Sequence, residues 1–345
     1  MGISVRMSHY VRGCETRWFV VGLVATLFVR EGLAKGLRSP SAASYLQRGS
    51  EYFSQGDLDR AIADYNIAIT FDPNYAKAYN NRGLARWTKG EVNGAIEDYT
   101  LALRHDPSLA EAYDNRGLAF QTKKDWNRAI QDHGRALELK PRWDLPYLHR
   151  GEVRRRIGDA IGALRDYNQA ILLNPKLEKA YLGRGLLRSE KMDLTGAVED
   201  FNQAIQCNPA FIEAYVNRGE IRRRLGETSD AISDFGRAIQ INPRFPPAYY
   251  ARGNTWRGLK EFDQAISDYN HVLALDPHRA DAYNNRGNAY LGKGELEAAR
   301  ADYARAISIN PFYSLAYFNR GLVLLLLGMA EDSQKDFDQA VKLNF

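Results

Sequence analysis

Small and apolar side chains recur along this chain at helical spacings, and the pattern restarts every 34 residues. In residues 76–109, one helical run carries Ala78, Tyr79 and Gly83, and a second run after Gly90 carries further apolar residues up to Pro107. Side chains three and four apart share one face of a helix, so each unit predicts two helices of about 12–14 residues joined by a short turn.

The clearest mark of the period is an Arg-Gly pair that occurs nine times without insertion or deletion. Its glycines, each four residues after a tyrosine, are Gly49, Gly83, Gly117, Gly151, Gly185, Gly219, Gly253, Gly287 and Gly321. A fixed period of this length is typical of stacked-repeat proteins. Glycine inside a helix costs about 1 kcal/mol relative to alanine, so its recurrence predicts a close approach of the partner helix, with alanines such as Ala95 as the matching small surface.

This pattern resembles the tetratricopeptide repeat family across residues 42–345. Counting Ala76 as position 1, the family signature falls on Tyr79, Gly83, Ala95, Tyr99, Ala102 and Pro107, at positions 4, 8, 20, 24, 27 and 32. The resemblance implies an all-α fold, a right-handed superhelix (α-solenoid) of nine helical-hairpin units. It also implies a concave face lined mainly by the first helices.

One departure from the family pattern carries its own prediction. Position 7, usually apolar in the family, is arginine in every repeat, and position 23 is aspartate in every repeat. A half-buried arginine requires a partner. We therefore expect an Arg–Asp pair in each unit, for example Arg82 with Asp98, within one repeat or across neighbouring repeats. The alternative is that these arginines bind an anionic ligand.

Residues 1–41 read as a separate leader. A 12-residue apolar segment, 18–29, follows three arginines and is too short to cross a bilayer comfortably as a helix. A basic start, a short apolar stretch and small residues are typical of a secretory signal peptide. The leader predicts an exported or envelope-associated protein, with an uncleaved membrane tether and a cytoplasmic protein as the alternatives. Translation from Met7 instead of Met1 would give a more typical basic region.

Composition and motifs argue against two other classes of function. Of the net charge of +5, the leader contributes six basic and two acidic residues, which leaves 41 basic and 40 acidic side chains in the repeats. The repeats lack the concentrated positive charge of a nucleic-acid binder. They also show no HExxH motif, nucleophile elbow, phosphate-binding glycine loop or paired-cysteine spacing. We expect no catalysis, no cofactor, no metal and no small-molecule substrate.

Candidate contacts for a partner lie at positions that vary among the first helices. Position 6 is asparagine in Asn81, Asn115, Asn217, Asn285 and Asn319. An amide offers one acceptor and two donors, so it can hold the backbone of an extended peptide. The arrangement is similar to the asparagine ladder of the O-linked N-acetylglucosamine transferases, whose catalytic domain this chain lacks. A solvated helix face is the alternative, and Gly183 and Ala251 interrupt the ladder.

Two arginine triplets, 154–156 and 222–224, lie two repeats apart. Arg155, Arg156, Arg223 and Arg224 are expected to face inward and to suit an acidic segment, a phosphopeptide or a terminal carboxylate. The alternative is pairing along the helix with Glu152 and Glu220, four residues before Arg156 and Arg224. Trp87 is a further candidate contact near one end of the array.

These features predict a non-catalytic scaffold that binds an extended peptide or partner protein in a concave groove. Two alternatives remain at this stage. One is an assembly protein acting through homotypic end-to-end contacts, including a homodimer through the C-terminal repeat, where Leu322 to Leu327 form an apolar run. The other is a binder of polyanions or nucleic acid through the arginine triplets.

Overall fold

The computed structural model describes residues 41–343, and this part of the chain holds eighteen α-helices and no strands. Short loops pair the helices into nine hairpins. They are α2 (Ala42–Ser54) with α3 (Leu58–Phe71), α4 (Ala76–Thr88) with α5 (Val92–His105), α6 (Ala110–Thr122) with α7 (Trp126–Leu139), α8 (Asp144–Arg156) with α9 (Ala160–Leu173), α10 (Glu178–Glu190) with α11 (Leu194–Cys207), α12 (Ile212–Leu225) with α13 (Thr228–Ile241), α14 (Pro246–Gly258) with α15 (Phe262–Leu275), α16 (Ala280–Lys293) with α17 (Leu296–Ile309), and α18 (Ser314–Leu326) with α19 (Ala330–Lys342). The predicted all-α solenoid of nine helical hairpins is confirmed.

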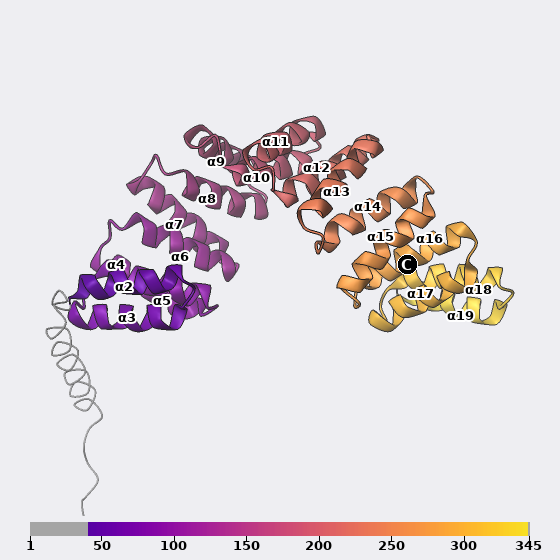
Figure 1. The fold of residues 1–345 in the computed structure, drawn as a ribbon, viewed down its shortest axis with the longest axis horizontal. Helices are drawn as coiled ribbons and strands as arrows, with labels where there is room; N and C mark the ends of the chain where they lie inside the picture. The colour runs from indigo at the N-terminus through magenta and orange to yellow at the C-terminus, as the bar shows by residue number, and fades with distance from the viewer. Residues whose placement is uncertain (1–40, 344–345) are drawn as a thin grey trace, which may run out of the picture. The chain divides into compact units, whose positions relative to one another are not determined.

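The chain forms two compact units, the first ending at Val153 and the second beginning at Arg154. Within each unit, consecutive hairpins stack in chain order (Figure 1). Apart from its last residue, the predicted leader with its apolar segment 18–29 lies outside the described residues. Among the helices of residues 41–343, none is long and apolar enough to span a membrane.

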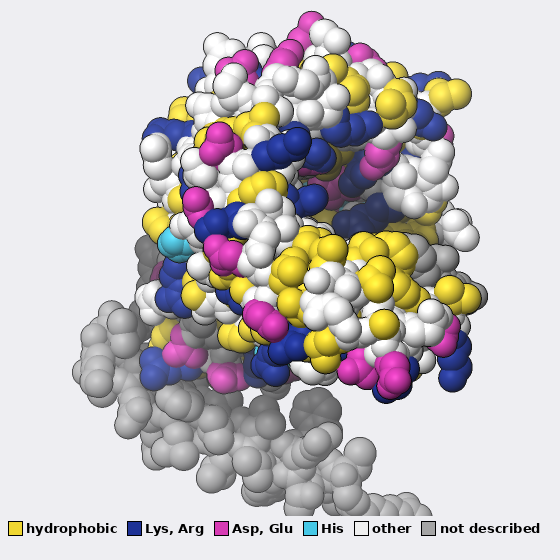
Figure 2. Space-filling model, turned by 90° about the vertical axis from the view of Figure 1, so that its right-hand side faces the viewer, with side chains coloured by type: hydrophobic (Ala, Val, Ile, Leu, Met, Phe, Trp, Pro, Cys, Tyr) yellow, Lys and Arg dark blue, Asp and Glu magenta, His cyan; other side chains and the backbone are white. Residues whose placement is uncertain are grey.

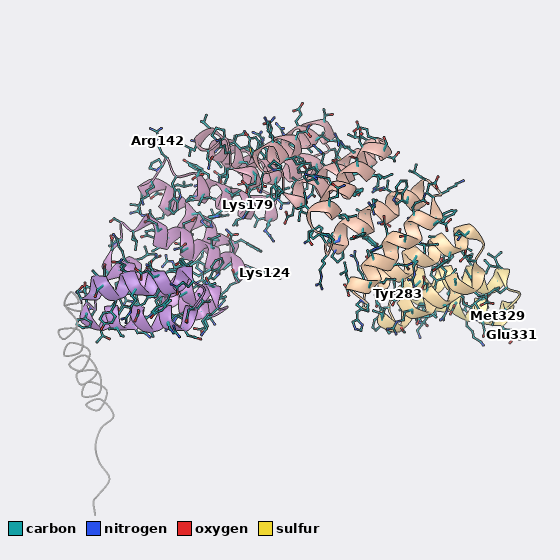
Figure 3. All side chains as sticks on the ribbon, viewed as in Figure 1. Lys124, Arg142, Lys179, Tyr283, Met329 and Glu331 are labelled. Carbon is teal, nitrogen blue, oxygen red and sulfur yellow. The ribbon has the colours of Figure 1, made fainter. Side chains whose placement is uncertain are left out.

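The turn inside each hairpin depends on one residue in the left-handed region, at position 15 of the repeat. In six hairpins this residue is glycine, as in Gly226 with φ of 84°. In three it is not, and Lys124, Met192 and Lys260 adopt φ of 59–65°. Figure 3 labels Lys124 in this turn between α6 and α7. A side chain in this region costs roughly 1–2 kcal/mol, which explains the preference for glycine.

The recurring glycine of the Arg-Gly pair packs against an aromatic ring of its own hairpin. A Cβ atom added to Gly83 would lie 2.8 Å from Cε1 of Tyr99, and one added to Gly219 would lie 2.7 Å from Cε1 of Phe235. The expected close approach is therefore present. The ring at position 24 fills the space, while the buried alanine at position 20 packs beside it.

Eight of the predicted Arg–Asp pairs are present, each within one repeat. The aspartate side chains are at most 9% exposed, and the pairs are Arg48–Asp64, Arg82–Asp98, Arg116–Asp132, Arg184–Asp200, Arg218–Asp234, Arg252–Asp268, Arg286–Asp302 and Arg320–Asp336. In each pair, two guanidinium nitrogens bind the carboxylate, a geometry that adds strength and orientation. These arginines belong to the scaffold.

The remaining guanidinium nitrogen often ties one hairpin to the hairpin before it. Nη1 donates to a side chain at position 25 of the preceding repeat in the contacts Arg82–Asn66, Arg116–Thr100, Arg184–Asn168, Arg218–Asn202 and Arg286–Asn270, at 2.6–3.2 Å. For Arg252 and Arg320 the equivalent residues are Gly236 and Ala304, which have no side-chain acceptor. The polar links between neighbouring hairpins are therefore uneven.

Candidate functional site

The asparagines at position 6 bridge neighbouring hairpins through position 5 of the preceding repeat. Nδ2 of Asn115 lies 3.1 Å from Oδ1 of Asn80, and Nδ2 of Asn319 lies 2.9 Å from Oδ1 of Asn284. Asn285 makes the equivalent contact with the hydroxyl of Tyr250, at 2.8 Å. Part of the donor capacity of these amides thus holds the stack together.

The other two asparagines of the set differ. Asn81 donates to the Ser50 hydroxyl of the preceding repeat at 3.4 Å, whereas Asn217 donates to the carbonyl of Glu213 in its own helix at 2.7 Å. Among the contacts of residues 41–343, none uses the amide oxygens of Asn115, Asn217 and Asn319 as acceptors. These oxygens leave acceptor capacity for a backbone N–H, and a role for the asparagines in peptide binding stays a prediction.

The two arginine triplets divide between the scaffold and the surface. The first arginine of each triplet binds the position-23 aspartate, with Nη1 of Arg154 2.8 Å from Asp166 and Nη1 of Arg222 2.8 Å from Asp234. Arg86 and Arg188, at the same position 11, do likewise with Asp98 and Asp200. This position was not singled out from the sequence, although its arginines recur at the 34-residue period.

One arginine of each triplet reaches the C-terminal end of α10. Arg155 of α8 pairs with Glu190, while Arg224 of α12 donates to the Ser189 hydroxyl and to the sulfur of Met192, both at 3.3 Å. Arg156 is exposed at the last residue of α8. The structure thus brings Arg155 and Arg224 to one short segment, 189–192.

Arg223 is paired along its own helix. Its Nη2 lies 2.5 Å from Oε1 of Glu220. That hydrogen bond raises the pKa of Arg223 above its usual value. Burial opposes the charge of Arg155, yet Tyr167 and Glu190 outweigh it and raise its pKa as well. Glu220 was considered as a partner for Arg224, but it binds Arg223 instead. Arg224 consequently keeps only uncharged partners among the described residues.

Trp87 lies against the core of the second and third repeats. Its ring packs beside Ala95, Tyr99 and Ala119, and its indole N–H lies 3.3 Å from the Thr122 hydroxyl. The residue is half-buried. This packing gives Trp87 a structural role, and a contact with a partner remains a prediction.

Three residues that were not predicted as a site meet in the first unit. Nδ1 of His133 on α7 lies 2.7 Å from Oδ1 of Asp114 on α6, and Nδ1 of His149 on α8 lies 3.0 Å from Oδ2 of the same carboxylate. Asp114 is 3% exposed and His133 is fully buried. Burial disfavours the Asp114 carboxylate, but its hydrogen bonds with the two histidines outweigh burial and lower its pKa to about 2.

These three side chains are the ones in residues 41–343 that could hold a metal ion, because their ligand atoms lie within 4.8 Å of one another. Gln121 adds a fourth polar group, with its amide nitrogen 2.8 Å from Nε2 of His133. The sequence shows these three unusual residues, but at different positions of the repeat. His133 replaces the aromatic ring of position 24, while Asp114 and His149 stand at positions 5 and 6 of successive repeats.

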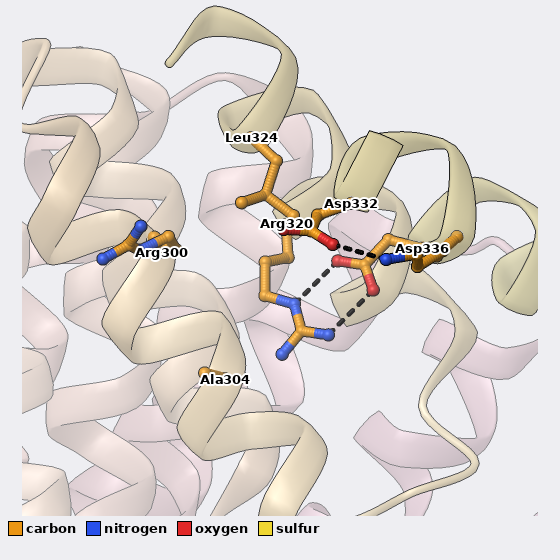
Figure 4. Close-up of a pocket in the computed structure, with 7 residues that line it drawn as sticks. Arg300, Ala304, Arg320, Leu324, Asp332 and Asp336 are labelled. Carbon is orange, nitrogen blue, oxygen red and sulfur yellow. Dashed lines mark hydrogen bonds and ion pairs between the residues drawn. The ribbon is translucent and has the colours of Figure 1, made fainter. Parts of the chain in front are cut away.

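A pocket of about 350 Å³ lies among α17, α18 and α19 (Figure 4). Its lining residues are Arg300, Ala304, Arg320, Leu324, Asp332, Lys335 and Asp336. Arg320 of α18 binds Asp336 of α19, Lys335 binds Asp332 within α19, and Arg300 pairs with Glu297 within α17. Because the cations are paired, the pocket has little net charge to attract an anion.

Apolar side chains are exposed on the last hairpin and on the loop before it. Phe312 of that loop is 80% exposed, and Leu325, Leu326 and Val341 of the hairpin are 54%, 62% and 72% exposed. Figure 2 faces the C-terminal side of the second unit and shows hydrophobic side chains gathered in one region bordered by charged ones. Figure 3 labels Met329 and Glu331 at the start of the final helix, α19. This end of the array could contact another protein surface.

Comparison with known families identifies the class of protein. A model described as TPR repeat matches residues 49–90 and 257–294, and models described as tetratricopeptide repeat match 76–109, 212–245, 280–313 and 315–345. Together these matches span more than half of the chain. The chain belongs to the tetratricopeptide repeat family. Repeats of this family build protein-interaction scaffolds, and that general role follows for this chain.

Two solved structures with TM-scores above 0.5 share this fold. Cut9–Hcn1 from the APC/C hetero-tetramer is similar with a TM-score of 0.59 at 17% identity, covering 81% of this chain and 55% of that one. A tetratricopeptide repeat protein from Parabacteroides merdae has a TM-score of 0.54 at 21% identity, covering 74% and 99%. MamA is 27% identical with a TM-score of 0.44, over 46% of this chain and 94% of MamA. No curated protein matches the chain significantly.

Proposed function

We propose that the protein is a non-catalytic scaffold that binds an extended acidic segment of a partner protein on the first-helix surface of α10 and α12. Arg155, Arg223 and Arg224 would make the charged contacts. The observation that carries the proposal is Arg224, an exposed cation whose partners, Ser189 and Met192, are both uncharged.

The arrangement around Arg224 suits a carboxylate ligand. Glu190, which pairs with Arg155, has a half-exposed side chain, so an incoming carboxylate can compete for the guanidinium. Lys191, the exposed residue that follows, adds a further positive charge. Arginine binds carboxylates through two parallel hydrogen bonds, which favours a defined ligand position. The amide of Asn217 in the same unit could accept from the backbone of the bound segment.

A binding measurement on the full chain tests this proposal. Fluorescence anisotropy of a labelled oligoglutamate peptide is compared with that of an oligolysine peptide of equal length. Replacing Arg155, Arg223 and Arg224 by glutamine should weaken oligoglutamate binding about tenfold, because three charge pairs of about 0.5 kcal/mol each make up about 1.5 kcal/mol. Binding should also weaken with added salt.

A matched control uses exposed arginines of the second helices and turns. Replacing Arg165, Arg237 and Arg244 by glutamine removes the same charge from the same unit, and binding should be retained. Equal loss in both triple variants would reduce the effect to net charge and overturn the proposed surface. Tighter binding of single-stranded DNA than of oligoglutamate would favour the polyanion alternative instead.

A second candidate function rests on the exposed apolar side chains of the last hairpin. We propose as this alternative that Leu325 and Leu326 mediate contact between two copies of the chain. Light scattering should then show a dimer that dissociates on dilution and is absent when both leucines are replaced by serine. A monomer at all concentrations excludes homotypic assembly.

The proposed place of action is outside the cytoplasm or at the cell envelope, on the basis of the apolar segment 18–29. N-terminal sequencing of the protein recovered from its native cell tests this. A mature start beyond the apolar segment supports export, while an intact residue 1 on protein found only in the cytoplasm contradicts it.

A further inference from the structure

Three departures from the repeat pattern meet at one point in the first unit. His133 is the one histidine at position 24, where the other repeats carry tyrosine or phenylalanine. Asp114 stands at position 5, where Asn80 and Asn284 stand in other repeats, and His149 stands at position 6, the asparagine position. The three residues belong to three helices, so nothing local in the sequence requires them to change together.

We infer that Asp114, His133 and His149 form a binding site for a divalent transition metal ion of the Zn²⁺ class. The site would be held by one carboxylate oxygen and the Nδ1 atoms of two imidazoles. It is independent of the proposed peptide-binding surface, which lies in the other unit.

The geometry of the donors fits such an ion. Nδ1 of His133 and Nδ1 of His149 both point to the Asp114 carboxylate, at 2.7 Å and 3.0 Å. Zinc binds nitrogen and oxygen ligands at about 2.0–2.2 Å in a tetrahedron, which separates neighbouring ligand atoms by about 3.4 Å. The ligand atoms therefore need to move apart by about 0.4–0.7 Å. The fourth position is then left for water.

The chemistry of the donors sets the choice of ion. Imidazole nitrogen suits Zn²⁺, Co²⁺ and Ni²⁺, whereas Ca²⁺ and Mg²⁺ prefer sites built from oxygen. Binding requires Nδ1 of each imidazole to be free of a proton, and a neutral imidazole then carries its proton on Nε2.

Gln121 supplies the outer partner that a metal-bound histidine normally has. Its amide nitrogen now lies 2.8 Å from Nε2 of His133 and 3.4 Å from the carbonyl of His149. Once Nε2 of His133 carries the proton, rotation of the amide presents Oε1 as the acceptor. Gln121 is thus a positioning residue and is not itself a ligand.

The buried charge is the reason to favour a metal ion over a hydrogen-bonded core. Other junctions of the array join positions 5 and 6 by uncharged amides, as between Asn80 and Asn115. Here a carboxylate that is 3% exposed replaces the amide. The two histidines compensate the burial of this carboxylate by hydrogen bonds, but among the described residues no Lys or Arg pairs with it. A divalent cation would add a full opposite charge and join α6, α7 and α8.

The test measures binding of ZnCl₂ to the full chain by isothermal titration calorimetry, after removal of any purification tag and dialysis against a chelator. Wild type should take up one Zn²⁺ per chain, and Co²⁺ in its place should give the intense visible absorption of a four-coordinate site. Zinc should also raise the unfolding temperature, since it binds the native state.

The variants restore residues that other repeats carry, which preserves the fold. Asp114→Asn, His133→Phe and His149→Asn should each weaken binding by more than the roughly 10- to 100-fold that follows loss of an outer-shell partner, and Gln121→Ala should fall within that range. The control His271→Asn, which changes an exposed histidine on α15, should bind as wild type does.

Failure of wild type to bind Zn²⁺ overturns the inference, as does equal uptake by all three ligand variants. Either result would reduce the cluster to a hydrogen-bonded core. Neither result bears on oligoglutamate binding, because Arg155, Arg223 and Arg224 lie outside the cluster.

Discussion

Arg218 holds the carboxylate of Asp234 with two nitrogens, Nε at 2.9 Å and Nη2 at 2.5 Å, while its third nitrogen binds Asn202 of the preceding repeat. Arg222 binds the same carboxylate. One aspartate side chain, 4% exposed, therefore serves two arginines. Replacing it by alanine would leave both without their charge partner.

We predict that Asp234→Ala destabilises the surrounding hairpins by about 3–5 kcal/mol, the range for removing one partner of a buried ion pair. The control is Asp263→Ala, because Asp263 pairs with Lys293 through a side chain that is 80% exposed. Loss of this exposed pair should lower the free energy of unfolding by about 1 kcal/mol or less. Hydrogen exchange in α12 and α13 reports on the first variant, and exchange in α15 and α16 reports on the control, since repeat arrays open locally. Similar effects of the two variants would contradict the structural role of the pair.

A second prediction concerns the recurring glycine. Gly219→Ala places a Cβ 2.7 Å from Cε1 of Phe235, so overpacking should destabilise the array by about 1–3 kcal/mol despite the better helix propensity of alanine. Gly258→Ala is the control, because nothing lies within 4 Å of the added atom. That change should be neutral or stabilising by up to about 1 kcal/mol. Urea unfolding midpoints distinguish them, and a harmless Gly219→Ala would refute the packing argument.

The inter-repeat amides give a third prediction. Asn319→Ala leaves the oxygen of the buried Asn284 without its donor, which should cost about 1–3 kcal/mol. Asn217→Ala removes only a contact within its own helix and should be nearly neutral. Hydrogen exchange in α18 and α19 should increase in the first variant alone. If exchange rises equally in both, position 6 does not couple the hairpins.

A fourth prediction concerns alkaline pH. Burial raises the pKa of Tyr269 to about 12, an effect that Arg257 only partly offsets. The unfolded tyrosine titrates near pH 10, so the unfolded state loses this proton first. Stability from this group is complete below about pH 10 and decreases as the pH rises toward 12, by on the order of 2 kcal/mol. The free energy of unfolding of the Tyr269→Phe variant, measured by chemical denaturation, should decrease less between pH 9 and about pH 12 than that of the wild type. An identical pH dependence of stability in both proteins would contradict the raised pKa of Tyr269.

The period alone predicts much of this structure. Helix pairing and the turn near position 15 follow from residues that recur together, and both are present. The Arg–Asp pairs follow in the same way and are present in the eight repeats named above. The packing of an aromatic ring on Gly83 was harder to predict. Alanine at position 20 and tyrosine at position 24 share a helix face, and the pattern does not say which of them fills the space beside the glycine. The alanines alone had been expected to supply the surface facing the glycine, and the aromatic ring lies there instead.

The candidate site was harder to predict, because its contacts join residues 35 apart. A side chain at position 5 meets position 6 of the next repeat, as Asn80 meets Asn115 and Asp114 meets His149. Within a single repeat, Asn80, Asn115, Asp114 and His149 look like unrelated polar residues on a solvated helix face. Only the offset between stacked hairpins relates them. The same offset brings Arg155 and Arg224 to the two sides of α10.

The uneven links between hairpins have a mechanical consequence. Other junctions are linked by the position-7 arginine to position 25, or by the position-6 side chain to position 5. At the junction between α13 and α14, Gly236 offers no side-chain acceptor to Arg252 and Ala251 carries no amide, so both links are missing. Apolar contacts around Tyr215, Ala238 and Ala248 hold it instead. Apolar contacts tolerate sliding better than directional bonds do. Under tension, the second unit would therefore open first at this junction, where the hairpins share the fewest directional contacts.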